Sequence, residues 1–459
     1  MGAFAGMLKT AGYEVTGSDQ NIYPPMSDML RSWGIPVLTP YDPATLDMVK
    51  PDLVVIGNVI RRVNPEATEV RARRLPQMSF PAALGAFFLQ DRHSVVVTGT
   101  HGKTTTTALL GHVLAAAGRD PSFLVGGVAR NYDASFRLGG GRHFVVEGDE
   151  YDTAYFDKGP KFLHYRPRTA ILTSIEFDHA DIFRDLDHYE AAFERFVRLL
   201  PSDGCLVVSA AYPNALRVAR GSPTPIVTYG LVTGAGIPSP DYAARDLVHG
   251  PAGVRFTVLE RDRVLGIATL PGAGAHNVEN ALGVMAAARD LGLDFDEIAR
   301  GLATFEGVRR RQEVRGEVGG VLVLDDFAHH PTAVRATIGA IRARFPERRL
   351  WAVFEPRSNT SRRRIHQAEY VDALAGAPCV ALRVPEPHDM VPEDQRLDAD
   401  HVVAQLRARG VDARAEADVD RLVRVVADAA RPGDVVLVMS NGAFGGFIER
   451  LLVALARLA

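Results

Sequence analysis

The feature that most constrains this chain is the segment Gly99-Thr100-His101-Gly102-Lys103-Thr104-Thr105. It directly follows a buried-strand run at 93–97 and directly precedes a helical pattern. Glycines let the backbone curl around phosphate oxygens, and a helix N-terminus adds a favourable dipole. We expect Lys103 to reach the terminal phosphates of ATP and the Thr104 hydroxyl to bind Mg²⁺. The loop is shorter than the standard phosphate loop, and the alternative is a glycine-rich turn that carries a lysine by coincidence.

Two acidic clusters follow later strand-like runs. The first contains Glu147, Asp149 and Glu150, and the second is Thr173-Ser174-Ile175-Glu176-Phe177-Asp178-His179-Ala180-Asp181. Since ligands bind at the carboxyl edge of α/β sheets, both clusters predict Mg²⁺ sites, and His179 between two aspartates is well placed to be a ligand. The alternatives are a solvated acidic loop and an ordinary surface turn.

Three further motifs lie downstream. Asn277 and Asn280 are three residues apart and share a helix face, where they could read an adenine edge while His276 stacks on it. The alternative is helix N-capping by asparagine. Arg311 ends an arginine run that is either a phosphate clamp or a solvated face. Asp325-Asp326-Phe327-Ala328-His329-His330 ends a strand, and its adjacent histidines do not predict zinc, because no third ligand stands at metal spacing.

The length of 459 residues predicts about three domains. Strand-like and helix-like runs alternate in three α/β segments, so we expect domains at 1–92, 93–313 and 314–459. Strands are expected at 13–17, 53–57, 93–97, 144–146, 170–173, 206–209, 321–324, 350–354 and 435–439. Helices are expected at 3–11, 276–288, 332–344 and 443–459. The stretch 221–250 is rich in Gly, Pro and Ser and predicts irregular connections.

Composition excludes several classes of protein. A net charge of −3 offers no basic surplus for nucleic acid, and no apolar run is long enough for a membrane span. The two cysteines, Cys205 and Cys379, do not make a disulfide framework and are typical of a reducing cytosol. The start of the chain lacks a secretory leader, so a cytoplasmic protein is expected.

The order of these motifs resembles the Mur ligase family, and the resemblance covers nearly the whole chain. The fold it implies is α/β in three parts: an N-terminal Rossmann-like UDP-binding domain, a central P-loop ATPase domain and a C-terminal Rossmann-like domain. Longer segments resemble the branch of the family that adds a preformed peptide in peptidoglycan recycling. They are 17–27, 148–158, 164–167, 354–360 and 440–446.

The resemblance implies an ATP- and Mg²⁺-dependent ligase acting through an acyl phosphate. Its substrates would be UDP-N-acetylmuramate and the murein tripeptide L-Ala-γ-D-Glu-meso-diaminopimelate. Lys103, Glu147, His179 and Arg311 would be catalytic, and Thr104, Glu147 and His179 would bind the metal. The resemblance also assigns a larger set of binding residues. Those for the nucleotide are Gly99, Thr100, His101, Gly102, Lys103, Thr104, Thr105, His276, Asn277, Asn280, Arg311, Asp326 and His330, and those for the substrates are Asp19, Arg357, Ser358 and Asn359.

The chain departs from the family pattern at its start. Met1-Gly2 falls inside the glycine-rich loop that follows the family's first strand, so we expect the UDP-binding domain to lack that strand. A monomer or weak homo-oligomer is expected, with no nucleic-acid or membrane partner. Three other functions stay open: the sister ligase that adds free L-alanine, a more distant amino-acid-adding relative such as a folylpolyglutamate synthase, and a non-catalytic ATP-binding sensor of wall fragments.

Overall fold

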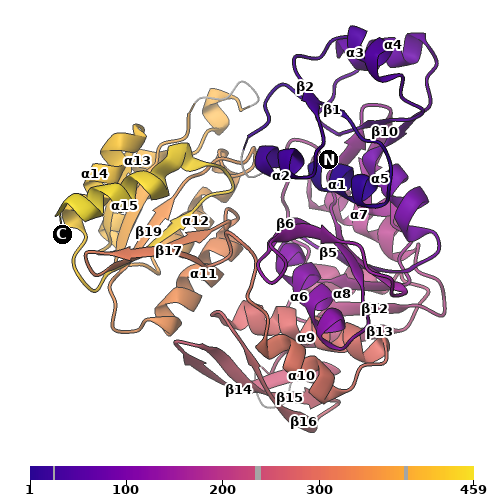
Figure 1. The fold of residues 1–459 in the computed structure, drawn as a ribbon. Coiled ribbons are helices and arrows are strands. Elements are labelled where there is room, and N and C mark those ends of the chain that lie inside the picture. Colours follow the sequence, from indigo (N-terminus) through magenta and orange to yellow (C-terminus); the bar gives the residue numbers. More distant parts are fainter. Residues whose placement is uncertain (24–25, 233–238, 387–390, 459) are drawn as a thin grey trace.

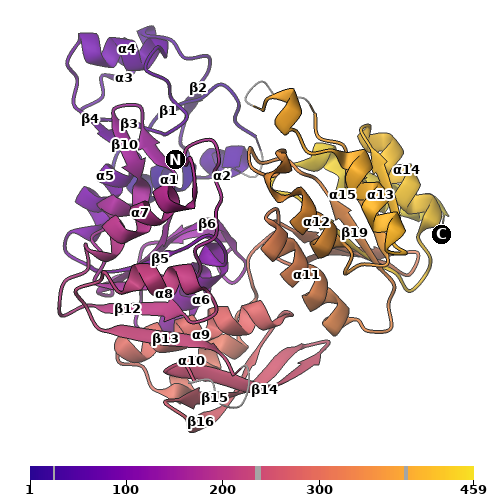
Figure 2. The ribbon, with the colours of Figure 1, turned by 180° about the vertical axis from the view of Figure 1, so that it is seen from behind.

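The computed structural model describes residues 1–23, 26–232, 239–386 and 391–458. The chain forms three α/β parts, with the N-terminal part seated on the central one and the C-terminal part beside it (Figure 1). Seen from behind, the same arrangement holds, and the C-terminal helix lies at the outer edge of the molecule (Figure 2).

A ten-stranded sheet organises the central part, in the order β16-β15-β14-β13-β12-β11-β5-β8-β6-β7. The strands from β14 to β6 in that order run parallel to one another. At the two ends of the sheet, β15, β16 and β7 pair antiparallel. The strands are β5 (His93–Thr98), β6 (Ser122–Ala129), β7 (Ala134–Arg137), β8 (His143–Gly148), β11 (Thr169–Leu172), β12 (Cys205–Ser209), β13 (Ile226–Leu231), β14 (Tyr242–Gly250), β15 (Gly253–Glu260) and β16 (Arg263–Leu270). A small hairpin of β9 (Asp152–Ala154) and β10 (Asp157–Pro160) lies apart from this sheet.

Helices cover both faces of the central sheet. Neighbouring residues of each buried strand point to opposite faces, so each face presents apolar side chains that a helix covers. Val95 and Val97 of β5 pack in one core with α6 and α9, whereas Val96 packs in the opposite core with α7. Phe4 and Met7 of the first helix join this second core, so the N-terminal part is anchored to the central one. The central helices are α6 (Lys103–Ala116), α7 (Leu186–Val197), α8 (Pro213–Ala219), α9 (Ala275–Asp290) and α10 (Phe295–Ala303).

The N-terminal part contains two separate pairs of short parallel strands. Parallel pairing agrees with the expected Rossmann-like layout, but the strand expected at 13–17 is wrong apart from Gly17, and the helix expected at 3–11 is confirmed within one residue at each end. The elements are α1 (Gly2–Thr10), β1 (Gly17–Ser18), α2 (Met26–Ser32), β2 (Val37–Leu38), α3 (Ala44–Val49), β3 (Val54–Ile56), α4 (Pro65–Ala72), β4 (Gln77–Ser79) and α5 (Phe80–Leu84).

The C-terminal part is a six-stranded sheet in the order β17-β18-β22-β19-β20-β21, parallel except for β17. Helices α11, α12 and α13 pack on one face, and α14 and α15 on the other. Its elements are β17 (Glu313–Val318), β18 (Val321–Asp326), α11 (Pro331–Arg344), β19 (Leu350–Phe354), α12 (Gln367–Leu374), β20 (Cys379–Arg383), α13 (Ala399–Ala408), β21 (Asp412–Glu416), α14 (Val419–Ala429), β22 (Val435–Met439) and α15 (Phe447–Leu458).

The expectation of irregular structure at 221–250 is wrong for half of that stretch. Strands β13 and β14 occupy 226–231 and 242–250 and extend the parallel sheet. Strand formers such as Ile226, Val227 and Tyr229 lie within β13, while the Gly, Pro and Ser residues lie mainly in the connections. Residues 233–238 of the stretch lie outside the described part of the chain.

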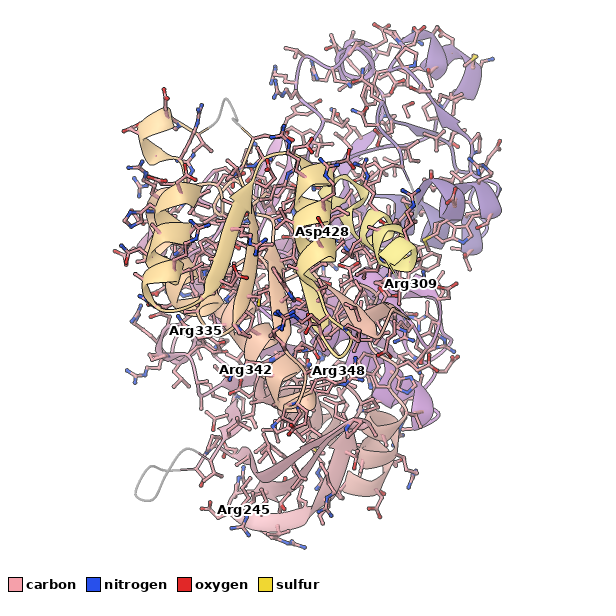
Figure 3. The ribbon with its side chains drawn as sticks, turned by 90° about the vertical axis from the view of Figure 1, so that its left-hand side faces the viewer. Arg245, Arg309, Arg335, Arg342, Arg348 and Asp428 are labelled. Atoms are coloured by element: carbon pink, nitrogen blue, oxygen red, sulfur yellow. The ribbon has the colours of Figure 1, made fainter. Side chains whose placement is uncertain are left out.

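Arginines are dispersed over the molecule. Figure 3 shows Arg335, Arg342 and Arg348 on and after α11, Arg309 in the segment before β17, and Arg245 at the far end of the central sheet. Among the described residues, no helix has the length and apolar character needed to cross a membrane.

Candidate active site

The phosphate loop joins β5 to α6 and packs tightly against neighbouring segments. Gly99 has a φ of +129°, and a Cβ there would lie 2.3 Å from Thr173 Oγ1. Gly102 has a φ of +78°, and its Cβ would lie 2.5 Å from Asn280 Oδ1. Larger residues would clash at both positions, so the two glycines set the path of the loop.

Lys103 is held by the loop and by one carboxylate. Its Nζ donates hydrogen bonds to the carbonyl oxygen of Gly99 at 2.5 Å and to Glu150 Oε1 at 3.0 Å. Burial acts to lower the pKa of Lys103, but the charges of Glu150 and Asp149 outweigh it, so the pKa is raised. The ammonium is therefore a fixed positive charge at the mouth of a phosphate loop.

Thr104 and Glu147 form an oxygen-rich pair beside Lys103. The Thr104 hydroxyl donates to Glu147 Oε1 at 3.0 Å, and the N–H of Gly126 donates to Glu147 Oε2 at 2.7 Å. Burial raises the pKa of Glu147, although Gly126 and Lys103 oppose it. A hydroxyl and a carboxylate next to a phosphate loop fit Mg²⁺, which prefers hard oxygen ligands and completes its shell with phosphate and water.

Glu150 is a functional residue that the sequence did not single out. Its side chain is fully buried and accepts hydrogen bonds from Lys103, from the Tyr189 hydroxyl at 3.0 Å and from His179 Nε2 at 3.1 Å. Burial acts to raise the pKa of Glu150, but Lys103 and His179 lower it. The carboxylate thus links the phosphate loop to the second acidic cluster.

The surroundings of His179 favour its charged form, the imidazolium. Burial acts to lower its pKa, but Asp178 and Glu150 raise it to about 9. Its Nε2 is engaged by Glu150, so Nδ1 is the nitrogen left to hold a metal ion, and that ion would have to replace a proton. The donor set at His179 therefore fits a metal only with loss of this proton.

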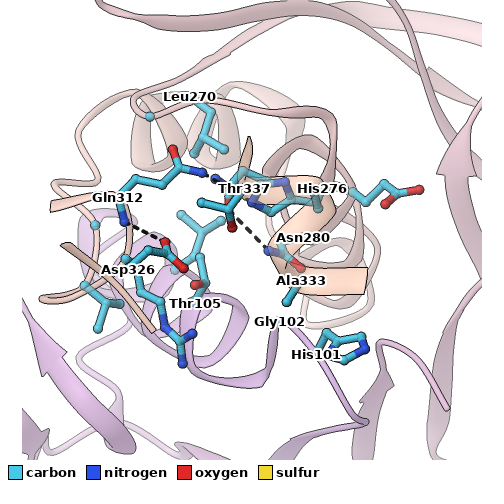
Figure 4. A pocket seen from close by; sticks show the side chains of 18 of the residues that line it. His101, Gly102, Thr105, Leu270, His276, Asn280, Gln312, Asp326, Ala333 and Thr337 are labelled. Carbon is cyan, nitrogen blue, oxygen red and sulfur yellow. Dashed lines mark hydrogen bonds between the residues drawn. The ribbon is translucent and has the colours of Figure 1, made fainter. Parts of the chain in front are cut away.

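A cavity of about 290 Å³ opens between the central and C-terminal parts. Its size is near the lower end of small-molecule pockets. Figure 4 shows His101, Gly102, Thr105, His276, Asn280, Gln312 and Asp326 around it. Asn277, Arg311 and Thr332 also line it. The structure therefore gathers most of the residues that the sequence assigned to nucleotide binding, although they are distant in the chain.

The amide residues of α9 point along the cavity rather than capping the helix. The N-cap residue is Gly274, which gives no side-chain cap, so the capping alternative is wrong. Asn280 Nδ2 lies 3.4 Å from Asn277 Oδ1, and Asn277 Nδ2 donates to the carbonyl oxygen of Ala273 at 2.7 Å. Burial, with a contribution from Arg311, lowers the pKa of His276 to about 4, so its ring is neutral.

Asp326 lies on the opposite wall, at the end of β18. Its carboxylate accepts hydrogen bonds from the backbone N–H of Gln312 at 2.9 Å and of Ala328 at 2.8 Å. Burial raises the pKa of Asp326, against the effect of Arg311. Arg311 itself reaches across the cavity, with Nη2 3.3 Å from Thr104 Oγ1.

Two other side chains join the phosphate loop to α11. Glu176 Oε2 lies 2.6 Å from His101 Nε2, and Glu176 Oε1 accepts a hydrogen bond from the Thr332 hydroxyl at 3.0 Å. His330 is the N-cap residue of α11, and its Nδ1 lies 4.0 Å from Glu176 Oε2. Glu176 belongs to the second acidic cluster, but the sequence assigned it no role of its own, because its partners His101 and Thr332 are distant in the chain.

The residues predicted to bind the substrates lie outside this cavity. Asp19 is exposed at the end of β1, where its carboxylate accepts from the N–H of Asn21 at 3.0 Å. Arg357 is exposed after β19, and the Ser358 hydroxyl bonds Ser361 within a local turn. In the same segment, which includes Asn359, Thr360 Oγ1 accepts from the N–H of Ala180 at 3.2 Å. The segment therefore touches the central part next to His179.

Comparison with known proteins identifies all three parts. Family models described as "Mur ligase family, catalytic domain", "Mur ligase middle domain" and "Mur ligase, glutamate ligase domain" match residues 1–92, 97–288 and 310–442. The chain is 40% identical over 461 residues to the UDP-N-acetylmuramate–L-alanyl-γ-D-glutamyl-meso-2,6-diaminoheptandioate ligase of Escherichia coli (strain K12), covering 100% of this chain and 96% of the relative.

Two further proteins are somewhat less similar to this chain. A UDP-N-acetylmuramate–L-alanine ligase of Burkholderia cenocepacia is 35% identical, covering 98% of this chain and 95% of the relative. The crystal structure of a murein peptide ligase from Psychrobacter arcticus matches with a TM-score of 0.73 and 36% identity, covering 100% of this chain and 97% of that one. On this evidence the chain belongs to the Mur ligase family, whose members are ATP-dependent ligases.

Proposed function

We propose that this chain joins L-Ala-γ-D-Glu-meso-diaminopimelate to UDP-N-acetylmuramate at the expense of ATP, in peptidoglycan recycling. The observation that carries the proposal is the 40% identity over the whole chain to the Escherichia coli ligase named for these substrates. The sister activity, addition of free L-alanine, has weaker support, since that relative is 35% identical.

The reaction has two chemical steps. A lactyl carboxylate oxygen of UDP-N-acetylmuramate attacks the γ-phosphorus of ATP, the bond to the β–γ bridging oxygen breaks, and ADP leaves. The amine nitrogen of L-Ala then attacks the carbonyl carbon of the acyl phosphate, loses a proton, and inorganic phosphate leaves. The Lys103 ammonium, held by Glu150, is the group that stabilises negative charge on the transferred phosphoryl group.

Magnesium fits this site through Thr104 and Glu147, with His179 as the residue that would hold a second ion. When bound, Mg²⁺ supplies positive charge that stabilises phosphoryl transfer. Arg311 lies within reach of the same phosphates, because its guanidinium touches Thr104. The cavity lining supports roles for His276, Asn277 and Asn280 around adenine and for Asp326 at the ribose.

The two remaining substrates are proposed to bind outside the cavity. Asp19 is proposed to meet a ribose hydroxyl of the UDP group, as acidic residues do at the ends of Rossmann strands. Arg357, Ser358 and Asn359 are proposed to meet the peptide, a role that the contact between Thr360 and Ala180 supports by bringing the segment next to His179. We further propose a cytoplasmic monomer or weak homo-oligomer.

An isotope experiment tests the chemistry. UDP-N-acetylmuramate labelled with oxygen-18 in its lactyl carboxylate is incubated with ATP, Mg²⁺ and the tripeptide. Attack by the carboxylate on the γ-phosphorus predicts one labelled oxygen in the released phosphate. Unlabelled phosphate would contradict the acyl-phosphate route, and label in AMP would indicate adenylation instead.

A further inference from the structure

His101, Glu176 and His330 meet at the junction of the central and C-terminal parts. Each offers one ligand atom, and these atoms all lie within 4.8 Å of one another. His101 comes from the phosphate loop, Glu176 from the segment after β11, and His330 from the start of α11. The cluster is the only such group of three or more His, Cys, Asp or Glu side chains among the described residues.

The spacing of the donor atoms is near that of a bound ion. Zinc takes nitrogen and carboxylate oxygen at about 2.0–2.2 Å, which at tetrahedral angles places two donors roughly 3.3 Å apart. The distances from Glu176 Oε2 to His101 Nε2 and to His330 Nδ1, 2.6 and 4.0 Å, fall on either side of that value. Each of these two distances differs from that value by about 0.7 Å.

The His330 imidazole is available as a ligand. It is 93% buried as a side chain (7% exposed), and its Nε2 has no hydrogen-bond partner among the described residues. Its Nδ1, the nitrogen that faces Glu176, accepts a hydrogen bond of 3.3 Å from the N–H of Thr332, so an ion bound at Nδ1 would replace this bond. Burial, with His101 contributing, lowers the pKa of His330 to about 3, so the ring is neutral near pH 7.

The carboxylate of Glu176 is also oriented for coordination. The Thr332 hydroxyl donates to Glu176 Oε1 and leaves Oε2 facing the two rings. Such hydrogen bonds orient ligating carboxylates in metal sites. Two imidazoles and one carboxylate suit a borderline transition metal rather than Mg²⁺, which prefers oxygen ligands.

We propose that His101, Glu176 and His330 form a binding site for a zinc-class transition-metal ion that joins the central and C-terminal parts, with water completing its shell. Two ligands belong to one part and the third to the other, so the bound ion stabilises their closed arrangement. Because His101 also lines the cavity, occupancy is expected to slow the opening that releases product. The proposal does not depend on which amine the enzyme uses.

Cobalt(II) is the probe that tests the site. The full-length protein is titrated with Co²⁺ in excess Mg²⁺, which fills the oxygen-rich sites, and the visible absorption of tetrahedral Co²⁺ is recorded. We expect one equivalent to bind. His330→Ala, His101→Ala and Glu176→Gln should each weaken binding by at least about 100-fold, since changes to groups around ligands alone cost roughly 10–100-fold.

Two variants serve as matched controls. His329→Ala removes the adjacent histidine, whose Nε2 faces Asp178 at 3.7 Å, and His179→Ala removes the predicted ligand of the other metal site. Both should keep the Co²⁺ absorption. Equal binding in His330→Ala and the unaltered protein, loss of the absorption in His179→Ala, or no tetrahedral signal at all would overturn the proposal.

Thermal unfolding separates lost ligation from lost folding. Zn²⁺ should raise the Tm of the unaltered protein, because an ion that binds only the folded state stabilises it by mass action. The metal-free Tm of each variant shows that it folds, and Zn²⁺ should leave the Tm of His330→Ala unchanged. The same Zn²⁺-dependent rise in both proteins would contradict the assignment.

Discussion

The carboxylate of Glu150 shows how a single buried residue can connect two parts of a site. It contacts Lys103, His179 and Tyr189, which come from the phosphate loop, the second acidic cluster and α7. The sequence predicted Lys103, Glu147 and His179, because motifs mark them. It could not rank Glu150 above its acidic neighbours, because only the folded chain shows which carboxylate faces Lys103.

Replacing Glu150 by Gln tests this role. The change keeps the shape of the side chain and one acceptor oxygen but removes the negative charge that offsets Lys103 and stabilises the charged form of His179. We expect kcat to fall by about 10- to 100-fold, as it does when a group that orients a metal ligand is lost. Tyr189→Phe is the control, since it removes one hydrogen bond and keeps the carboxylate. A similar kcat for both variants would contradict the role of the charge.

Arg357→Ala tests the proposed peptide segment. Arg357 is exposed and lies outside the nucleotide cavity, so its loss should act on the acceptor alone. We expect the KM for the tripeptide to rise by about tenfold, which corresponds to a loss of roughly 1.4 kcal/mol of binding free energy. The KM for ATP should be unchanged. Equal increases in both KM values would show that Arg357 has no specific contact with the peptide.

At the scale of elements, strands with a continuous apolar run were predictable, whereas strands inside a stretch rich in Gly, Pro and Ser were not. The runs at 93–97 and 435–439 contain three and five consecutive apolar residues, as expected for strands covered on both faces, and they lie within β5 and β22. Strands β13 and β14 are interior strands with residues of good strand propensity, but the Gly, Pro and Ser around and between them pointed to irregular structure.

Gly99→Ala tests the phosphate loop as a unit. The added Cβ would lie 2.3 Å from Thr173 Oγ1 at a positive φ, so the loop must move. We expect ATP binding to be lost and the protein to be destabilised by about 1–3 kcal/mol, measured by nucleotide titration and denaturant unfolding. Gly118→Ala is the control, because Gly118 has a φ of +72° with no atom within 4 Å of its Cβ. Unchanged ATP affinity in Gly99→Ala would contradict the loop assignment.

Two histidines that pair at the first positions of β5 and β8 predict that the free energy of unfolding depends on pH. His93 and His143 are register partners with ring centroids 5.6 Å apart, and the His143 pKa is lowered from 6.5 to about 4 by burial and by Arg142. At a pH between these two pKa values, the His143 ring therefore carries a proton in the unfolded chain but not in the folded chain. Stability from this group is present above pH 6.5 and is lost as the pH falls toward 4.

Denaturant unfolding across that pH range measures the effect. One proton taken up on unfolding contributes a slope of up to about 1.4 kcal/mol per pH unit. His143→Gln cannot titrate and should show a shallower slope than the unaltered protein under the same conditions. Identical slopes would mean that His143 is protonated in the folded state.

At the scale of the whole molecule, the site exists only because distant parts of the chain meet. Thr332 contacts Glu176 and Thr360 contacts Ala180 across the boundary between the central and C-terminal parts, and Arg311, at the end of the central part, contacts Thr104. The motif order in the sequence predicted the three-part fold and eight of the residues that line the cavity. It gave no sign of these contacts, because each joins residues more than 150 positions apart.

The same separation explains why the histidine cluster was not predicted. His330 stands beside His329 in the sequence, but its ligand partners in space are His101 and Glu176. Spacing along the chain marks a metal site only when the ligands are local. Here the sheet edge and the start of α11 bring them together.

The measurement that tests the central claim most directly is the acceptor preference of the purified protein. Phosphate release is followed with ATP, Mg²⁺ and UDP-N-acetylmuramate, using either L-Ala-γ-D-Glu-meso-diaminopimelate or free L-alanine, and the products are identified by mass. We expect release to depend on the tripeptide, with a kcat/KM at least about 100-fold above that for L-alanine, or roughly 2.7 kcal/mol of discrimination. A preference for L-alanine would assign the chain to the sister activity, and no release with either acceptor would contradict the proposed function.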